Sequence, residues 1–414
     1  MDNRLTYQRA EDKKGRNPVV NQYVYYPDGT LKEAAGGGIT YCYEYTQNGL
    51  LKRKASSGKT LLQYSYDKNR NVTSMLDVTG KQVRYAYDAM NRLKRVEDVE
   101  RGAALAGYRY TTFGRIETLE YGNGIKSEYQ YGEDGNLSSL VTVTPKGVVL
   151  LNYEYAYDDS GNISCLETKV GGEILLSFRY EYDGNGNRTS KIGEQKLAGG
   201  ESSNLSATYQ YDIRGQLLEE KRNGEAVCYI YDAAGNRLQR VNKKEVTSYR
   251  YNEKNQLVSE VGCREKRNFI YDPQGSIIRE ESPHGTKQFL YNTKNQQTEV
   301  RLGDGNVQTN RYDAENLRCE MRENEKLIQF VYHRGELLYE RGEGHQTSYY
   351  LGAGIGGSQI GQQVYYYHQD EQLSTALITD AIGNIQNYYR YDAFGWELDN
   401  AECIFNRIRY AGQQ

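Results

Sequence analysis

The stretch YDAAGNRL, from Tyr231 to Leu238, is repeated in altered form along most of the chain. Units that begin with Tyr-Asp and continue in a similar way start at Tyr66, Tyr87, Tyr157, Tyr182, Tyr211, Tyr271 and Tyr391. In the second half, the tyrosines at the head of each unit stand at positions 211, 231, 251, 271, 291, 312 and 332, a period of 20 or 21 residues. A fixed period of this length is the signature of a repeat architecture.

Each unit has the pattern of a β-hairpin. Two tyrosines alternate with another residue ahead of the turn, as in YSY at Tyr64 and YQY at Tyr209. Alternation with period two places both rings on one face of a strand. The Asp that follows can accept hydrogen bonds from the backbone of the turn. The pattern therefore predicts a strand, a turn centred on the two residues after the Asp, and a second strand.

The fourth position after the tyrosine supports this interpretation. Gly and Asn most readily adopt the left-handed conformation, which closes a short hairpin loop that begins as a type I turn. This position is Gly at 49, 114, 135, 161, 186, 215, 235, 275 and 395, and Asn at 91, 255, 295 and 316. Arg70 is the clearest exception, so a strained or altered turn is predicted there.

The abundance of tyrosine predicts a core in which Tyr takes the place of Leu and Ile. Only 37% of the 414 residues are hydrophobic, yet the chain has 41 Tyr against 7 Phe and 1 Trp. Disordered chains are poor in aromatic residues and rich in proline, whereas this chain has 5 Pro. Each buried Tyr ring contributes on the order of 4 kcal/mol before entropy costs. Stacked hairpins share faces and bury a continuous core, so we expect an all-β array of antiparallel hairpins.

Charge and composition argue against several classes of function. The net charge is −3, from 52 basic and 55 acidic residues, which does not favour nucleic acid or an anionic membrane as a partner. No apolar run approaches 18 residues, so no membrane span is expected. The opening DNRLTYQ lacks the apolar region of a secretory signal. The six cysteines are scattered without a CxxC pair, which argues against zinc and a dense disulfide framework and leaves the compartment open.

These repeats closely resemble the YD repeats of the Rhs and teneurin-like family, the β-shell proteins of bacterial polymorphic toxins. The resemblance covers nearly all of the chain and is most specific from Tyr365 to Leu398, YYYHQDEQLSTALITDAIGNIQNYYRYDAFGWEL. That segment looks like the start of the Rhs-associated core, and RIRYAGQQ, which ends at Gln414, looks like its continuation. The resemblance implies a YD-repeat array over residues 1–350 and the beginning of the core over residues 351–414.

The resemblance also implies a function. Family members spiral their hairpins into a hollow shell, and many enclose a C-terminal toxin that an aspartyl autoprotease at the end of the core releases. This chain stops before the expected cleavage segment and before any toxin domain, so we expect an inactive fragment with an open shell. Its edge strands would be Leu5–Arg9 and Arg407–Tyr410. The implied partners are the remainder of the shell and a toxin polypeptide, and the parent protein would be secreted or at the cell surface.

The candidate residues are structural, with no catalytic, cofactor or metal residues predicted. They are the repeat residues Tyr66, Asp67, Tyr87, Asp88, Tyr157, Asp158, Tyr182, Asp183, Tyr211, Asp212, Gly215, Tyr231, Asp232, Gly235, Tyr271, Asp272, Gly275, Tyr391, Asp392 and Gly395. The alternative is a cell-surface module that binds carbohydrate through exposed tyrosines. Hairpin repeats of similar length that bind choline or glucans depend on paired Trp, however, and Trp396 is alone in this chain.

Three motifs suggest other chemistry and are better explained as turns. GAGIGG, from Gly352 to Gly357, matches a phosphate-binding pattern, but a strand pattern follows it where a helix is needed. DGNGNR, from Asp183, suggests a calcium loop, but Arg188 stands where Gly is required. His368, Asp370 and Ser374 lie close in sequence without a nucleophile elbow or oxyanion hole, so we predict a turn-and-capping role.

Overall fold

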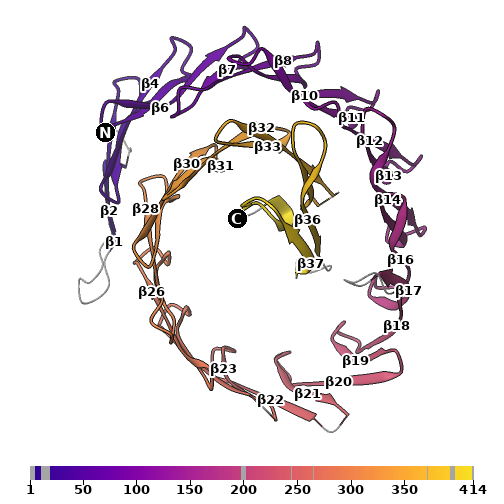
Figure 1. The fold of residues 1–414 in the computed structure, drawn as a ribbon. Helices are drawn as coiled ribbons and strands as arrows, with labels where there is room; N and C mark the ends of the chain where they lie inside the picture. The colour runs from indigo at the N-terminus through magenta and orange to yellow at the C-terminus, as the bar shows by residue number, and fades with distance from the viewer. Residues whose placement is uncertain are drawn as a thin grey trace. The chain divides into compact units, whose positions relative to one another are not determined.

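The computed structural model describes residues 5–10, 19–196, 202–243, 245–263, 265–370, 372–391 and 397–412. These residues form 37 β-strands in one sheet and one 3-10 turn, which confirms the all-β prediction (Figure 1). Asp392 and Gly395 of the last repeat lie outside the described residues.

The strands are short and follow one another closely along the chain. The first ten are β1 (Tyr7–Ala10), β2 (Val19–Tyr25), β3 (Leu31–Gly36), β4 (Ile39–Tyr45), β5 (Leu51–Ser56), β6 (Lys59–Tyr66), β7 (Val72–Leu76), β8 (Gln82–Tyr87), β9 (Leu93–Asp98) and β10 (Ala103–Tyr110). The next fifteen are β11 (Ile116–Tyr121), β12 (Lys126–Tyr131), β13 (Leu137–Val143), β14 (Val149–Tyr157), β15 (Ile163–Val170), β16 (Glu173–Tyr182), β17 (Arg188–Lys196), β18 (Ser202–Tyr211), β19 (Leu217–Arg222), β20 (Glu225–Tyr231), β21 (Arg237–Asn242), β22 (Glu245–Tyr251), β23 (Leu257–Val261), β24 (Lys266–Tyr271) and β25 (Ile277–Ser282). The remainder are β26 (Gly285–Tyr291), β27 (Gln297–Arg301), β28 (Val307–Tyr312), β29 (Arg318–Glu323), β30 (Lys326–His333), β31 (Glu336–Gly342), β32 (His345–Gly352), β33 (Gly354–Ile360), β34 (Gln363–Gln369), β35 (Thr375–Thr379), β36 (Ile385–Tyr391), β37 (Glu397–Glu402) and the 3-10 turn η1 (Tyr410–Gly412).

The pairing is that of consecutive hairpins. Within β1–β10, β12–β25 and β26–β37, each strand pairs antiparallel with the next one along the chain. In the unit of Tyr231 the register shifts between Ile230 and Tyr231, where a bulge opens next to the turn. A bulge at this point is what a type I turn followed by a left-handed residue produces.

The repeat aspartate stabilises its turn by hydrogen bonds to residues of the same turn. The backbone N–H of Asp232 donates to Asn236 O over 2.9 Å, and Gly235 N donates to Asp232 O over 3.1 Å. The carboxylate of Asp232 accepts from the backbone N–H of Asn236 at 2.8 Å and from its side-chain amide at 2.9 Å. The bond from the Asn236 side chain is the main cause that holds the pKa of Asp232 below its usual range. The predicted capping role of this aspartate is thus seen directly.

The turn position is left-handed wherever a described repeat has Gly or Asn there, as predicted. Gly235 has φ 91°, and Asn255 has φ 58°. The same conformation occurs at Gly49, Gly114, Gly135, Gly161, Gly186, Gly215, Gly275, Asn91, Asn295 and Asn316. Of the strained or altered turn predicted at Arg70, the strained alternative is confirmed: Arg70 takes φ 70°, and its N–H still bonds to Asp67 O at 3.2 Å as in the other turns. The strain there lies in an L-residue that occupies a glycine conformation.

The tyrosine that heads a unit ties that unit to the one before it. The hydroxyl of Tyr231 donates over 2.9 Å to the carbonyl of Leu217, the first residue of the strand after the preceding turn. Ten other tyrosines make the same bond, with lengths of 2.7–3.1 Å. The pairs are Tyr66 with Leu51, Tyr87 with Val72, Tyr110 with Leu93, Tyr131 with Ile116, Tyr157 with Leu137, Tyr182 with Ile163, Tyr211 with Arg188, Tyr271 with Leu257, Tyr312 with Gln297 and Tyr332 with Arg318. The period of the sequence is therefore also a period of hydrogen bonding.

The chain divides into two compact units. Unit 1 comprises residues 1–110, 119–124 and 288–414, and unit 2 comprises residues 111–118 and 125–287. Unit 1 contains the main hydrophobic core, in which Leu62 and Met75 share a cluster with Phe330 and Leu338. In unit 2 most strand residues from β19 to β25 are half-buried, and neighbouring rings such as Tyr153 and Tyr155 stack along one strand.

One predicted edge strand is wrong. Arg407–Tyr410 forms no strand, and its residues continue into η1. The reason is burial: Ile408 is inserted into the core, and its carbonyl accepts a bond from the hydroxyl of Thr375 at 2.8 Å. The carbonyl of Arg409 accepts from Thr375 N at 3.0 Å. At the other end, β1 (Tyr7–Ala10) falls within and just beyond the predicted stretch Leu5–Arg9 and pairs with β2.

Candidate functional site

Within unit 1, two parts of the chain that are distant in sequence pack face to face. Strands β2–β10 lie against strands β28–β36, and Figure 1 shows β6–β10 alongside β30–β33. We call the packing between these two groups of strands the interlayer contact. Its apolar part joins Leu62 and Tyr64 on one side to Ile328 and Phe330 on the other. This contact is the candidate functional site because it turns a series of local hairpins into a double-layered wall.

The turn after Tyr312 is held by the N-terminal strands. Tyr41 donates to the carboxylate of Asp313 over 2.9 Å, and Tyr43 donates to Glu315 over 2.6 Å. Lys54 forms an ion pair with the same Glu315 at 2.6 Å, and its ammonium lies 3.9 Å from the centre of the Tyr41 ring. Burial raises the pKa of the Asp313 carboxyl and, together with Asp313, raises that of Tyr41. An aspartate that caps its own turn therefore also anchors a strand some 270 residues away in the sequence.

The backbones of the two layers approach each other closely at Gly37. This residue has φ 57°, and a Cβ atom there would lie only 1.9 Å from the carbonyl oxygen of Tyr312. The neighbouring Gly36 faces Ala314 in the same way, at 3.0 Å from its Cα. Only glycine satisfies both the left-handed conformation and this distance. The loop between β3 and β4 is thus shaped to receive the Tyr312 turn.

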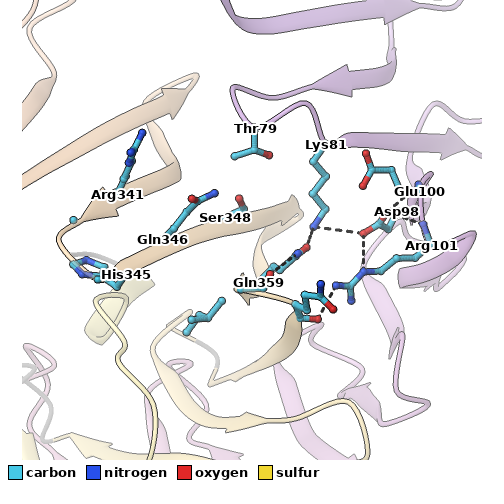
Figure 2. A pocket seen from close by; sticks show the side chains of 15 residues that line it. Thr79, Lys81, Asp98, Glu100, Arg101, Arg341, His345, Gln346, Ser348 and Gln359 are labelled. Atoms are coloured by element: carbon cyan, nitrogen blue, oxygen red, sulfur yellow. Dashed lines mark hydrogen bonds and ion pairs between the residues drawn. The ribbon is translucent and has the colours of Figure 1, made fainter.

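A cluster around Lys81 forms the second polar part of the interlayer contact (Figure 2). Lys81 is 7% exposed and pairs with Asp98 at 3.5 Å. Its ammonium also donates to Gln359 at 2.5 Å and to the hydroxyl of Tyr350, with the ring centre of Tyr350 3.5 Å away. Arg101 pairs with Asp98 at 3.7 Å and donates to the carbonyl of Gln362 at 2.7 Å. Burial lowers the pKa of Lys81 to about 8, although Asp98 opposes the shift.

The turn-and-capping prediction is confirmed for Asp370 and Ser374 but is wrong for His368, which is a core residue. Asp370 accepts from the backbone N–H of Ser374 at 2.8 Å and so caps a turn of the repeat type. His368 points into the core, where its Nε2 lies 2.9 Å from the Thr379 hydroxyl and its ring packs edge-on to Tyr121. Burial lowers the pKa of His368 to about 3, which keeps the imidazole neutral.

The two ligand-like motifs are also structural. In GAGIGG, β32 ends at Gly352 and β33 begins at Gly354, so the segment is a tight turn followed by a strand, as expected. The backbone N–H of Ala353 donates to the hydroxyl of Tyr108 over 3.2 Å, which ties this turn to β10. In DGNGNR, Asp183 accepts from the N–H groups of Asn185 and Asn187 at 2.9 Å and caps the turn of its repeat.

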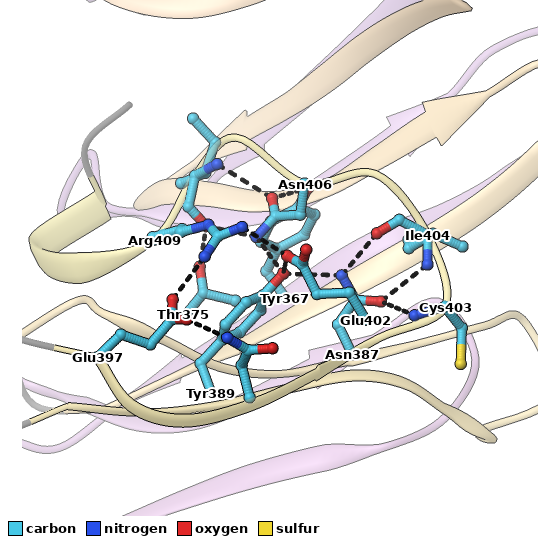
Figure 3. Close-up of polar contacts among 12 residues, drawn as sticks. Tyr367, Thr375, Asn387, Tyr389, Glu397, Glu402, Cys403, Ile404, Asn406 and Arg409 are labelled. Atoms are coloured by element: carbon cyan, nitrogen blue, oxygen red, sulfur yellow. Dashed lines mark hydrogen bonds and ion pairs between the residues drawn. The ribbon is translucent and has the colours of Figure 1, made fainter. Parts of the chain in front are cut away.

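The segment after β37 is fixed by a dense polar network (Figure 3). Asn387 accepts from the N–H of Cys403 and of Ile404 at 3.0 Å, and its amide donates to Ile404 O at 2.9 Å. Asn406 accepts from the hydroxyl of Tyr367 at 3.0 Å. Arg409 pairs with Glu397 at 2.5 Å and with Glu402 at 2.9 Å.

One ion pair in this region has a fully buried carboxylate. Arg407 pairs with Glu340 at 2.7 Å, and the Glu340 side chain has no exposed surface. The second carboxylate oxygen of Glu340 accepts from Tyr349 at 3.0 Å. The guanidinium of Arg407 also lies 5.6 Å from the ring centre of Phe330. A buried carboxylate with both oxygens satisfied fixes the last segment against β31 and β32.

No three His, Cys, Asp or Glu side chains among the described residues gather closely enough to hold a metal ion. Across the same residues, no helix has the length and apolar character needed to span a bilayer. All six cysteines are described, and each is a free thiol. Among the described tyrosines, only Tyr7 is exposed, at 49%.

Comparisons with known proteins agree with this architecture. The crystal structure of TcdB2–TccC3 superimposes with a TM-score of 0.64 at 15% identity, over 99% of this chain and 24% of that one. The Photorhabdus luminescens Tc holotoxin pore, with a TccC3 variant, gives a TM-score of 0.58 at 14% identity over 99% and 23%. At such identities these structures support the fold alone. This chain thus spans about a quarter of their length.

A sequence relative and a family match lead to the classification. Double-stranded DNA deaminase toxin A of Burkholderia cenocepacia (strain H111) is 27% identical over 117 residues, which is 28% of this chain and 7% of that protein. The repeats and their consecutive antiparallel pairing define a β-hairpin repeat protein. The Teneurin YD-shell family model matches residues 151–413, more than half of the chain, and the chain belongs to this family. The resemblance to Rhs and teneurin-like repeats is confirmed.

Proposed function

We propose that this chain is a structural module in the shell of a toxin protein, and that the shell encloses or presents a C-terminal toxin polypeptide. Membership of the Teneurin YD-shell family supports a shell role. The similar proteins named above include a deaminase toxin and components of Tc toxins, which supports a toxin context. In this proposal the parent protein is secreted or displayed at the cell surface, and the chain itself catalyses no reaction.

The interlayer contact is the observation that carries the proposal. Strands β28–β36 pack against strands β2–β10 through buried tyrosines and ion pairs, which gives unit 1 two layers of sheet. A wall built this way resists proteases because its buried strands open only by breaking many contacts at once. The division into an array over residues 1–350 and a core beginning at residue 351 is part of the same proposal.

The carbohydrate-binding alternative has less support. Sugar-binding repeats need exposed aromatic platforms, whereas the repeat tyrosines here are half-buried or buried and bond to backbone carbonyls. A glycan array with the purified protein tests this alternative, and specific binding that is lost on Tyr→Ala changes would favour it.

Limited proteolysis of the parent polypeptide tests the leading proposal. We expect peptides downstream of this chain to be protected in the wild type and to become accessible in Lys54→Glu, which places a carboxylate against Glu315. Lys52→Glu, at an exposed residue of the same strand, makes the same charge change and should leave protection intact. Equal digestion of the downstream polypeptide in all three proteins would contradict enclosure.

A further inference from the structure

A cavity of about 920 Å³ opens beside the Lys81 cluster in unit 1. Lys81, Asp98 and Arg101 line one side, and Arg341, Gln346 and Ser348 line the other (Figure 2). This volume is within the range of pockets that hold small molecules or side chains of a partner. None of the repeat tyrosines, aspartates or turn glycines lines this cavity, so binding there would be a function beyond the shell role.

The three residues on the far side share one face of the β31–β32 hairpin. Arg341 stands directly opposite Gln346, and Tyr339 stands opposite Ser348. Cross-strand partners lie on the same face, as do residues two positions apart on a strand. Arg341, Gln346 and Ser348 therefore point the same way, into the cavity, as Figure 2 shows.

These three side chains are available for a ligand. Among the described residues, none forms a hydrogen bond or ion pair with the side chain of Arg341, Gln346 or Ser348. Ser348 is only 7% exposed, so its hydroxyl faces the cavity and not bulk water. The Nε2 atom of His345, which also lines the cavity, is buried without a hydrogen-bond partner. Arg341 and Gln346 are exposed to solvent, so a ligand would replace water at these two side chains and at the Ser348 hydroxyl.

On the opposite side of the cavity most of the polar side chains already have hydrogen-bond or ion-pair partners, and their charges contribute to the net charge of the cavity. Lys81 and Arg101 are both bound to Asp98, and Gln359 is bound to Lys81. Counting the lining residues, three cations (Lys81, Arg101 and Arg341) face two carboxylates (Asp98 and Glu100), which leaves one positive charge. Arg341 is the cation of this set that lacks a carboxylate partner among the described residues.

We propose that this cavity binds a carboxylate, with Arg341 as its principal anchor and Gln346 and Ser348 as additional donors. The planar guanidinium presents two parallel N–H groups that match the two oxygens of a carboxylate. The amide of Gln346 and the hydroxyl of Ser348 can donate to the same group or to its neighbouring atoms. The carboxylate can belong to an acidic side chain of a polypeptide or to an acidic sugar.

Saturation-transfer NMR with the whole chain tests the proposal and separates these sources. The probes are N-acetyl-glutamate N-methylamide and glucuronate, each paired with its neutral counterpart, N-acetyl-glutamine N-methylamide and glucose. We expect at least one acid to bind and its neutral counterpart not to bind. Arg341→Gln should weaken binding at least about tenfold. Arg341→Lys should weaken it less, because lysine keeps the positive charge and loses only the two parallel N–H groups of the guanidinium.

Arg322→Gln is the matched control, since Arg322 is an exposed arginine on β29 away from the cavity and should bind as the wild type does. If Arg341→Gln fails to fold, the double variant Gln346→Ala/Ser348→Ala takes its place and must also weaken binding. Binding of one acid alone identifies the source, and equal binding of both shows that the carboxylate itself is recognised. No binding of either acid, equal binding of the neutral probes, or unchanged binding by the variants would overturn the proposal.

Discussion

The hydroxyl of Tyr64 lies 2.7 Å from Nδ1 of His333, which is 269 residues further along the chain. Their ring centres are 5.5 Å apart, so the two residues form both a hydrogen bond and a packing contact between the layers. Burial, with a smaller effect of Arg334, lowers the pKa of His333 to about 4. The interlayer contact therefore depends on an imidazole that is neutral at physiological pH.

Acid should weaken the interlayer contact through His333. Its pKa in the folded state is about 4, below the ordinary 6.5, so between these values the unfolded state binds more protons and stability falls as pH falls. The full shift corresponds to about 3 kcal/mol. Urea unfolding from pH 7 to pH 4 should show this loss, and His333→Gln should reduce it. His284→Gln, at an exposed histidine, should keep the wild-type slope, and an identical slope in His333→Gln would refute the assignment.

Alkaline solution should have the opposite effect through Lys81. Its pKa of about 8 in the folded state lies below the ordinary 10.5, so the unfolded state binds more protons between these values and stability rises with pH. Up to about 3 kcal/mol is expected from this shift. Above pH 10 buried tyrosines such as Tyr108, with a pKa raised to about 12 by burial, reverse the trend. Lys81→Met should abolish the rise between pH 8 and 10, measured by urea unfolding, and a persistent rise would point to another group.

Loss of one inter-repeat hydroxyl should loosen one pair of repeats. Tyr231→Phe removes the donor to Leu217 O but keeps the ring, and we expect a loss of about 1 kcal/mol. Native-state hydrogen exchange in β19 and β20 is the suitable measurement, because the effect is local. Tyr229→Phe, on the same strand and with no hydroxyl bond to a described residue, is the control. Equal protection in both variants would show that the hydroxyl bond adds no stability.

The local half of the structure could be predicted from the sequence, and the interlayer contact could not. Gly235 and Asp232 act on atoms within four residues, so their spacing specifies the turn. Lys81 and Tyr350 meet across 269 residues, and because all repeats share one pattern, nothing in the pattern says which repeat faces which. The edge strand expected at Arg407–Tyr410 followed from a shell taken to be open at both ends, whereas burial of Ile408 and bonds to Thr375 hold this segment in another form.

The turn glycine should be replaceable by asparagine but not by a β-branched residue. Gly235 has φ 91°, and Gly235→Val should lower the free energy of unfolding of its hairpin by roughly 1–2 kcal/mol or more. Gly235→Asn should cost much less, since Asn255 holds the same position with φ 58°. Hydrogen exchange of β20 and β21 measures both. Equal costs for Val and Asn would mean that the left-handed conformation does not limit this position.

Close approach at Gly37 gives a test of the interlayer contact itself. Gly37→Ala introduces both left-handed strain and a collision with Tyr312 O, whereas Gly58→Ala introduces only the strain, because no atom lies within 4 Å of its Cβ. We expect Gly37→Ala to cost about 1–3 kcal/mol more in urea unfolding than Gly58→Ala. Proteolysis after β3 should increase only in Gly37→Ala. Equal stability of the two variants would show that the loop shifts without penalty.

The 269-residue separation of Tyr64 and His333 has a consequence for biosynthesis. Tyrosine bonds between repeats span 14 to 23 residues, so each hairpin can be secured soon after it leaves the ribosome. The apolar face around Leu62 and Met75 is buried only after partners such as Phe330 have been synthesised. At ordinary translation rates that delay is roughly 15–55 s. During this time the nascent chain exposes a tyrosine-rich surface that favours aggregation. The chain is therefore expected to bind chaperones that prevent aggregation of newly made proteins.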